Sequence, residues 1–437
     1  MNITNKEILN IAIPSIISNI TVPLLGLVDV TIVGHLGSAS YIGAIAVGGM
    51  LFNMIYWLFG FLRMGTGGMT SQAYGRKDSE EYNNILLRSI TISFGIALVM
   101  IIMQIPIRET AFIFIDASNE VKTYATQYFH ICIWGAPAML GLYSFTGWFI
   151  GMQNSRFPMV IAITQNIINI VVSLLLVTQC DMKIDGIAYG TLTAQYAGFF
   201  MAVFLAGKYL KKDNRHSSIR DIFKKDSMSV FFKVNRDIFL RTLCIVAVTV
   251  FFTSTGAAYG DTMLAVNTLL MQMFTIFSYI MDGFAYAGEA IVGKNIGSKD
   301  YIQLNKTIKH LLFWGTGVAV FFTVLYGIGG KGFLNLLTND DIVISAAGNY
   351  YYWVLAIPFA GFLAFILDGI CIGATATNLM LKSIFIASLF FFGIYYTTND
   401  TIGNHSLWMS FIVYLLARGI VQSYLTRKLI QSDYQAS

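Results

Sequence analysis

Twelve long apolar runs constrain this chain more than any other feature of its sequence. A helix needs about 20 residues to cross the hydrocarbon core of a bilayer. Backbone groups there cannot hydrogen-bond to water, so runs of this length must be helical. We therefore predict an all-α polytopic membrane protein with twelve transmembrane helices. The runs lie at residues 8–33, 42–69, 86–106, 125–149, 158–178, 186–207, 237–258, 264–292, 308–329, 348–372, 380–397 and 406–426.

Charge is scarce in this chain and unevenly distributed. Charged residues make up 12% of it and the mean hydropathy is +0.65, whereas a soluble domain carries about 25% charged residues. With the N-terminus inside, the outer loops hold four of the 28 Lys and Arg residues, namely Arg108, Lys122, Lys183 and Lys331. This asymmetry follows the positive-inside rule. We therefore expect a multi-pass protein of the bacterial cytoplasmic (inner) membrane with both termini in the cytoplasm.

The two halves of the chain repeat each other. The segment "AYGRKD" (residues 73–78) resembles "NIGSKD" (residues 295–300) at an offset of 222 residues. The same offset relates Gly95 to Gly317, Tyr128 to Tyr350, Gly147 to Gly369 and Gly151 to Gly373. Each half holds six helices, an even number, so the halves share one topology about a pseudo-two-fold axis along the membrane normal.

This repeat predicts two six-helix lobes with a substrate cavity between them. We place the N-terminal lobe at residues 1–207, a basic cytoplasmic linker at 208–236 and the C-terminal lobe at 237–437. The linker is interpreted as a solvated segment near anionic lipid rather than as a nucleic-acid patch. The four cysteines show no metal-ligand spacing and are interpreted as small packing residues.

Charged residues well inside the predicted helices are costly and mark candidate sites. They are Asp29, Arg63, Asp282, Glu289, Asp368 and Arg418. Arg418 lies near the inner end of the last helix, so we expect its head group to extend to water. We predict an intramembrane charge cluster of Arg63, Asp282, Glu289 and Asp368. Arg63 should pair with at least one of these acids, because an unpaired buried charge costs more than a buried pair. Whether this cluster is a static ion pair or a face that lines water stays open.

Asp29 lies near the outer end of the first helix, out of reach of Arg63. Counting depth along the other helices places Ser173 and Thr191 level with it and Asn169 slightly deeper. These groups predict a polar pocket in the N-terminal lobe; the alternative is that the neutral ones only satisfy their own helices. Desolvation favours the neutral form of a carboxyl group, so Asp29 is suited to bind and release a proton.

Four segments carry a resemblance to a known family. They are "IPSIISN" (13–19), "GLVDVTIVGHLG" (26–37), "FGFLRMGTGGMTSQAYGR" (59–76) and "LDGICIGATATN" (367–378). They resemble multidrug and toxic compound extrusion (MATE) transporters, and the last two resemble the DinF-like branch. The resemblance implies a cation-coupled antiporter that exports organic compounds by alternating access.

The resemblance also implies roles for individual residues. Asp29 matches the acid proposed to carry the coupling ion, and Pro14 matches a proline at which the first helix bends. The helix-5 pattern Asn-x-x-x-Asp appears here as Asn169-x-x-x-Ser173, and Thr191 matches a helix-6 threonine. Ser173 is a departure that removes the second carboxylate. Na⁺ is a hard cation that favours anionic oxygen ligands, as Ca²⁺ and Mg²⁺ do, so we expect H⁺ rather than Na⁺ as the coupling ion.

The expected partners are a small organic substrate, cationic or amphipathic, and the lipid bilayer. Aromatic and Met side chains suit such cations through cation–π contact and adaptable packing. We expect a monomer with no cofactor, no metal and no nucleic-acid partner.

Three other functions are alternatives for a membrane protein of this kind. A lipid or lipid-linked oligosaccharide flippase shares the two-lobe plan, but a pyrophosphate cargo favours a basic cavity. A major facilitator transporter also has two six-helix halves, but a lone Gly-Arg-Lys is a weak match to it. An enzyme is not expected, because the five scattered histidines form no catalytic motif.

Overall fold

The structure is a computed structural model that describes residues 3–34, 39–115, 118–210, 219–338 and 340–435. These residues are helical almost throughout, and no strand occurs among them. The chain divides into two compact units. We call Pro14–Phe231 the N unit, and Met1–Ile13 together with Phe232–Ser437 the C unit. The first turns of the chain, which the sequence alone assigns to the N-terminal lobe, therefore group with its second half.

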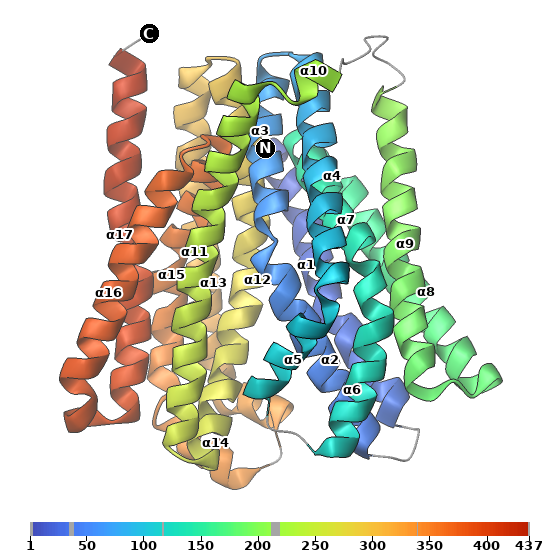
Figure 1. Ribbon diagram of the computed structural model, residues 1–437. Helices are drawn as coiled ribbons and strands as arrows, with labels where there is room; N and C mark the ends of the chain where they lie inside the picture. Colours follow the sequence, from blue (N-terminus) through green and yellow to red (C-terminus); the bar gives the residue numbers. More distant parts are fainter. Residues whose placement is uncertain (1–2, 35–38, 116–117, 211–218, 339, 436–437) are drawn as a thin grey trace. The chain divides into compact units, whose positions relative to one another are not determined.

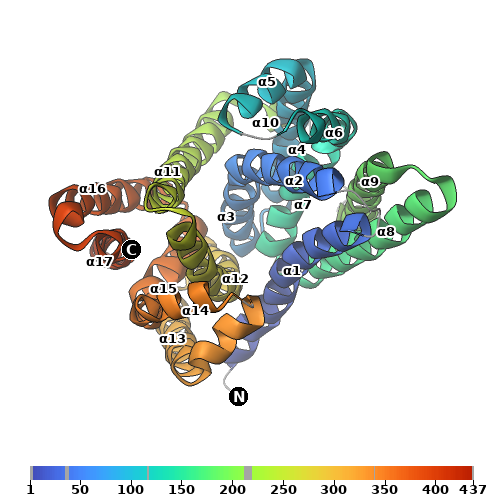
Figure 2. The same ribbon diagram turned by 90° about the horizontal axis from the view of Figure 1, so that it is seen from below.

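The N unit contains most of helix α1 and the helices as far as the start of α11 (Figure 1). Helices α8 and α9 form an antiparallel hairpin, side by side in both ribbon views (Figures 1 and 2). The elements are α1 (Ile3–Gly34), α2 (Ala39–Leu58), α3 (Phe61–Gly75), α4 (Ser79–Ile102), α5 (Gln104–Phe114), α6 (Asn119–Cys132), the 3₁₀ turn η1 (Ile133–Gly135), α7 (Ala136–Gly151), α8 (Arg156–Cys180), α9 (Lys183–Leu210) and α10 (Ile219–Ile222).

The C unit contains the beginning of α1 and most of α11 through α17. Helices α12 and α15 pack closely, and α16 and α17 form a second antiparallel hairpin (Figure 2). The elements are α11 (Lys225–Ala258), α12 (Asp261–Gly297), α13 (Tyr301–Leu337), α14 (Asp341–Gly348), α15 (Tyr351–Gly373), α16 (Thr377–Ile402) and α17 (Asn404–Gln435).

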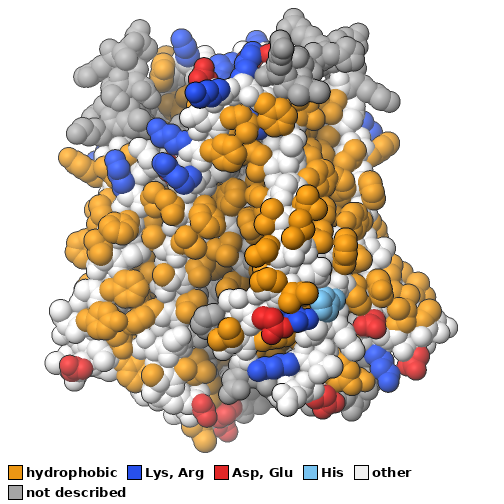
Figure 3. Space-filling view, viewed as in Figure 1, with side chains coloured by type: hydrophobic (Ala, Val, Ile, Leu, Met, Phe, Trp, Pro, Cys, Tyr) orange, Lys and Arg blue, Asp and Glu red, His pale blue; other side chains and the backbone are white. Residues whose placement is uncertain are grey.

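The membrane-spanning character of the helices agrees with the apolar runs. Ten helices among the described residues are long and apolar enough to cross a bilayer. The run predicted at 125–149 is broken by η1 into α6 and α7, each shorter than a full span. On the face drawn in Figure 3, apolar side chains cover the middle of the helices and charged ones gather toward their ends.

The predicted duplication is visible in backbone detail. Asp78 caps α4 and Asp300 caps α13, each accepting a hydrogen bond from the backbone N–H three residues on, at 3.1 and 2.9 Å. The residues before them, Lys77 and Lys299, share a positive φ of 58° and 57°. The offset is again 222 residues, so the turns of the two halves are built alike.

Close helix packing repeats at the same offset. A Cβ on Gly147 would lie 2.1 Å from the backbone oxygen of Arg63, and a Cβ on Gly369 would lie 2.1 Å from that of Ala285. Only glycine permits backbones to approach this closely. The pairs α3–α7 and α12–α15 are therefore equivalent contacts in the two units.

The predicted linker is partly structured. Within residues 208–236, the described part includes α10 and the first turns of α11. The Nε of Arg88, a buried residue of α4, donates a hydrogen bond to the backbone oxygen of Ile222 at 2.8 Å. Phe231 is buried against Met69 and Ile85. This segment is docked on the N unit rather than fully solvated.

Candidate functional site

Asp29 is a buried acid in the N unit. Only 7% of its surface is exposed, and its Oδ1 has no hydrogen-bond partner among the described residues. A buried polar atom without a partner loses its hydration without compensation. Since native structures contain few such atoms, this oxygen makes Asp29 a candidate site residue.

The α8–α9 hairpin holds the other predicted pocket residues. The Nδ2 of Asn169 donates a hydrogen bond to Oγ1 of Thr191 at 3.0 Å. Ser173, one turn further along α8, is fully buried, and its Oγ has no partner in the described part of the chain. Gly190 permits this approach, because a Cβ there would lie 2.0 Å from the Ser173 oxygen. The structure therefore brings Asn169, Ser173 and Thr191 together.

Two residues of α6 connect this hairpin to Asp29. The side chain of Tyr128 hydrogen-bonds to that of Thr191. It is also close enough to Asp29 for the two groups to interact electrostatically. Cys132, one turn later, also lies within reach of Asp29, and its thiol faces the backbone oxygen of Ala188 at 3.8 Å. Tyr128 and Cys132 thus lie between the Asp29 carboxylate and a hairpin that contributes the hydroxyls of Ser173 and Thr191 and the amide of Asn169.

The sequence analysis missed both α6 residues as members of this pocket. In the sequence Tyr128 is only a landmark of the repeat, and Cys132 has the features of a packing residue. Their spacing of four residues places them on one face of a helix, which is the signal that could have paired them. Nothing in the sequence alone indicates that this face meets Asp29.

The C unit contains a buried ion network around Asp368 of α15. Asp368 Oδ2 accepts hydrogen bonds from Arg241 of α11 and Arg418 of α17. Its Oδ1 accepts one from Nε2 of Gln422 at 3.0 Å. The interpretation of Arg418 as a side chain that extends to water is wrong: it is 5% exposed and bound to Asp368. Asp368 gives each of the two buried guanidinium groups an oppositely charged neighbour, as buried charges need.

Arg241 was not singled out from the sequence. The predicted span began at residue 237, which made Arg241 a residue of the helix end. In the structure α11 begins at Lys225, so Arg241 lies well inside the helix, with 6% of its surface exposed.

The other members of the predicted charge cluster belong to different units. Arg63 is a buried residue of α3 in the N unit, whereas Asp282 and Glu289 lie on α12 in the C unit. Asp282 acts electrostatically on Arg418, and Glu289 is fully buried. Pairing of Arg63 with one of these acids stays a prediction.

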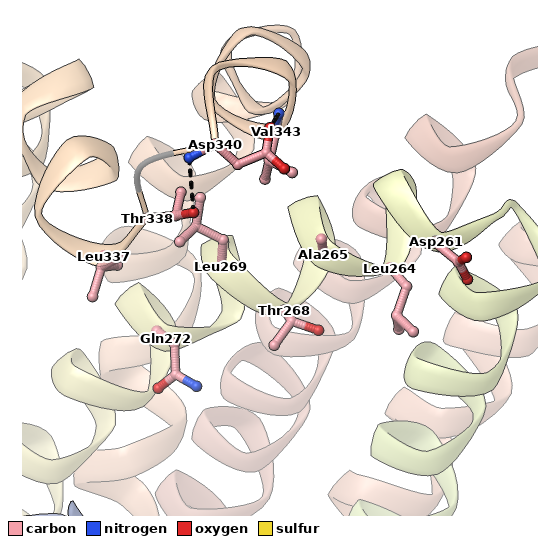
Figure 4. Close-up of a pocket in the computed structure, with 10 residues that line it drawn as sticks. All are labelled: Asp261, Leu264, Ala265, Thr268, Leu269, Gln272, Leu337, Thr338, Asp340 and Val343. Atoms are coloured by element: carbon pink, nitrogen blue, oxygen red, sulfur yellow. Dashed lines mark hydrogen bonds between the residues drawn. The ribbon is translucent and has the colours of Figure 1, made fainter. Parts of the chain in front are cut away.

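A cavity of about 510 Å³ opens in the C unit between the start of α12 and the α13–α14 connection (Figure 4). Among the described residues, its lining includes the acids Asp261 and Asp340 but no Lys, Arg, Phe, Tyr or Met. The Asp340 carboxylate is already engaged as the cap of α14. This cavity is therefore not the aromatic-lined one expected from the sequence.

The described residues contain no candidate metal centre, because no group of three or more His, Cys, Asp or Glu side chains among them could hold an ion.

The comparisons with known proteins identify the family of this chain. The family model MatE matches residues 14–175 and 238–397. The chain belongs to the MATE transporter family. The resemblance seen in the sequence motifs is confirmed.

Relatives of this MATE protein match it over most of its length. DNA damage-inducible protein F of Escherichia coli (strain K12) is 34% identical, covering 97% of this chain and 92% of the relative. The probable multidrug resistance protein NorM of Photorhabdus laumondii is 23% identical, covering 88% and 84%. The first of these supports the DinF-like assignment.

Solved structures share the fold of this MATE protein. The crystal structure of a MATE transporter in the bent conformation covers 100% of this chain and 97% of its own, with a TM-score of 0.88 at 18% identity. The twelve-helix, two-lobe architecture predicted from the apolar runs is therefore the MATE fold. The protein is a multi-pass membrane transporter of a multidrug efflux family.

Proposed function

We propose that this MATE protein is a proton-coupled antiporter that exports small organic cations or amphipathic compounds by alternating access. The observation that carries the proposal is Asp29, a buried carboxylate whose Oδ1 has no hydrogen-bond partner in the described part of the chain. In such surroundings only binding of a cation, H⁺ or a metal ion, removes the cost of the charge.

The composition of the pocket favours H⁺ over Na⁺. Ser173 supplies a hydroxyl where a second carboxylate would help to hold a hard cation. The remaining members, Tyr128, Cys132, Asn169 and Thr191, contribute neutral phenol, thiol, amide and hydroxyl groups. A proton needs only one carboxylate, and the neutral groups can hydrogen-bond to either form of it.

A transport cycle follows from the charge change at Asp29. When the acid is neutral, helix α1 can pack against the apolar interior of the N unit. When it is charged, the helix must keep the carboxylate solvated or paired. Pro14 lies inside α1 and interrupts its hydrogen-bond ladder, so it offers a place to bend between these arrangements.

The proposed setting is the bacterial inner membrane, with a monomeric transporter whose termini face the cytoplasm. The support is the distribution of Lys and Arg, which crowd the loops on the side of the termini. Export of cations agrees with the acids inside the helices, and with the similarity to NorM, a probable multidrug resistance protein.

Transport of ethidium by purified protein in proteoliposomes tests the proposal. We expect accumulation against a concentration gradient when a proton gradient is imposed, and none when a sodium gradient is imposed at symmetric, clamped pH. Full transport driven by sodium alone would refute proton coupling. Absence of ethidium flux under both gradients, in protein that still binds ethidium, would refute antiport.

A further inference from the structure

Helix α1 is shared between the two compact units. It is continuous from Ile3 to Gly34, yet Ile3–Ile13 belongs to the C unit while the remainder, with Asp29, belongs to the N unit. The change falls at Pro14, where the missing N–H removes one hydrogen bond of the helix and weakens it locally. One helix therefore connects the pocket of Asp29 to the other unit.

Polar contacts fix the beginning of α1 within the C unit. The C-unit residues that make these contacts lie in two places. They are found beside the turn between α12 and α13, which is the "NIGSKD" segment of the internal repeat, and on the first half of α13. The contacts are Gln303 Nε2 to Thr4 Oγ1 at 3.0 Å, Trp314 Nε1 to Asn5 Oδ1 at 3.2 Å and Lys294 Nζ to Glu7 Oε1 at 3.3 Å.

Burial supports these contacts. Thr4, Ile8 and Ala12 follow each other at spacings of four residues, which places them on one face of the helix, and all three are buried. Trp314 is itself held by stacking on Phe284, with the ring centroids 6.0 Å apart. The segment is therefore seated by an apolar face as well as by hydrogen bonds.

We propose that Thr4, Asn5 and Glu7 are positioning residues that anchor α1 to the C unit, so that α1 transmits the charge state of Asp29 across Pro14. Asp29 lies 15 residues beyond Pro14, about 22 Å along a helix with a rise of 1.5 Å per residue. A coupling path needs an element with two arrangements whose equilibrium both sites bias, and α1, with Pro14 and Pro23 inside it, can bend between two arrangements. An anchored helix meets that requirement, whereas a free helix end would let the movement dissipate.

The anchor rests on the proposed proton-coupled function and predicts a specific defect. Without it, Asp29 still binds a proton and the N unit still responds, but the response no longer moves the C unit. Substrate binding should keep its pH dependence while uphill transport is lost. A merely structural role would instead reduce the amount of folded protein and weaken binding together with transport.

The first experiment compares two variants of the full chain in proteoliposomes with ethidium as the probe. The triple variant Thr4→Val/Asn5→Leu/Glu7→Gln removes the anchor. Lys6→Gln is the matched control, because Lys6 is exposed on the same turn. We expect the triple variant to lose at least tenfold in proton-driven accumulation while its pH-dependent ethidium binding stays within about twofold of wild type. The control should behave as wild type.

Two results of this comparison would overturn the anchor. One is proton-driven accumulation by the triple variant equal to that of Lys6→Gln. The other is loss of pH-dependent binding along with transport, because the contacts would then act on the pocket itself. Charge reversal adds a rescue: Glu7→Lys and Lys294→Glu should each impair transport, and the combination should recover it at least threefold over either single variant. No recovery would also contradict the proposal.

A cross-linking experiment separates failure of the anchor from failure of proton coupling. Thr4→Cys/Gln303→Cys, in a chain whose Cys180 and Cys244 are replaced while the buried Cys132 and Cys371 are kept, is joined by a short bifunctional thiol reagent. The readout is ethidium counterflow, which needs no ion gradient. We expect the joined protein to exchange substrate, because the contact persists through the cycle. Blocked exchange would overturn the anchor, even where wild-type transport proves independent of protons.

Discussion

Removal of the Asp368 carboxylate should strongly destabilise the C unit. This acid lies between two buried guanidinium groups, and its loss in Asp368→Asn leaves Arg241 and Arg418 without their counter-charge. Breaking a buried pair by removing one partner costs about 3–5 kcal/mol. Against a total stability of about 5–15 kcal/mol, this is a large fraction.

Thermal unfolding in detergent, followed by fluorescence-detected size exclusion, measures this effect. A loss of 1 kcal/mol lowers the Tm of a domain of 150–250 residues by about 2–4 °C, so we expect a decrease of about 6–20 °C for Asp368→Asn. Asp341→Asn is the control, since Asp341 is an exposed acid in the first turn of α14. Its Tm should stay within about 2 °C of wild type.

A second substitution tests whether the loss comes from the stranded charge. Arg418 lies over the ring of Phe365, and Met can occupy that apolar space once the guanidinium is gone. Asp368→Asn/Arg418→Met should therefore be more stable than Asp368→Asn alone. Strict additivity of the two substitutions, or a Tm of Asp368→Asn equal to that of the control, would refute the account of this network.

Three further predictions follow from close contacts in the structure. Gly369→Ala should sharply lower the yield of folded protein, because its Cβ would lie 2.1 Å from a backbone oxygen of α12. Gly317→Ala is the control and should fold normally, since there is open space around Gly317. Equal yields of the two variants would contradict the close packing of α12 and α15. Ser173→Asp should make ethidium transport more sensitive to sodium, and an unchanged sodium response would remove Ser173 from the pocket. Arg88→Met should speed tryptic cleavage after Arg220, since it removes the hydrogen bond that docks α10; an unchanged cleavage rate would show that this bond does not hold the segment.

The helices and their repeat could be predicted because bilayer physics leaves few choices. An apolar run must be helical, and shared motifs at an offset of 222 residues fix which helices correspond. Boundaries were less predictable, because polar residues extend helices beyond the hydrocarbon core. The burial of Arg241 could not be predicted for that reason. The apolar run begins at residue 237, which places Arg241 near a helix end, but α11 begins at Lys225.

The pocket was predictable only in part. Counting residues from the outer ends of the predicted helices places Asn169, Ser173 and Thr191 at similar depths in the membrane. This works because residues equally far from the same side of the membrane lie level with each other on neighbouring helices. It could not reveal Tyr128 or Cys132, since the rotation of α6 about its axis depends on packing between helices distant in sequence. The partners of Arg418 were hidden for the same reason: hydropathy gives its depth but not the face on which Asp368 and Arg241 lie.

Gradient-driven transport by Asp29→Asn is the most direct test of the central claim, that Asp29 changes charge during each cycle. Asparagine is nearly isosteric with the protonated acid and still hydrogen-bonds, so the variant should insert and fold normally. We predict that it binds ethidium without dependence on pH and cannot accumulate it under a proton gradient, because it mimics the protonated state permanently. Normal proton-driven accumulation by well-folded Asp29→Asn protein would contradict the account.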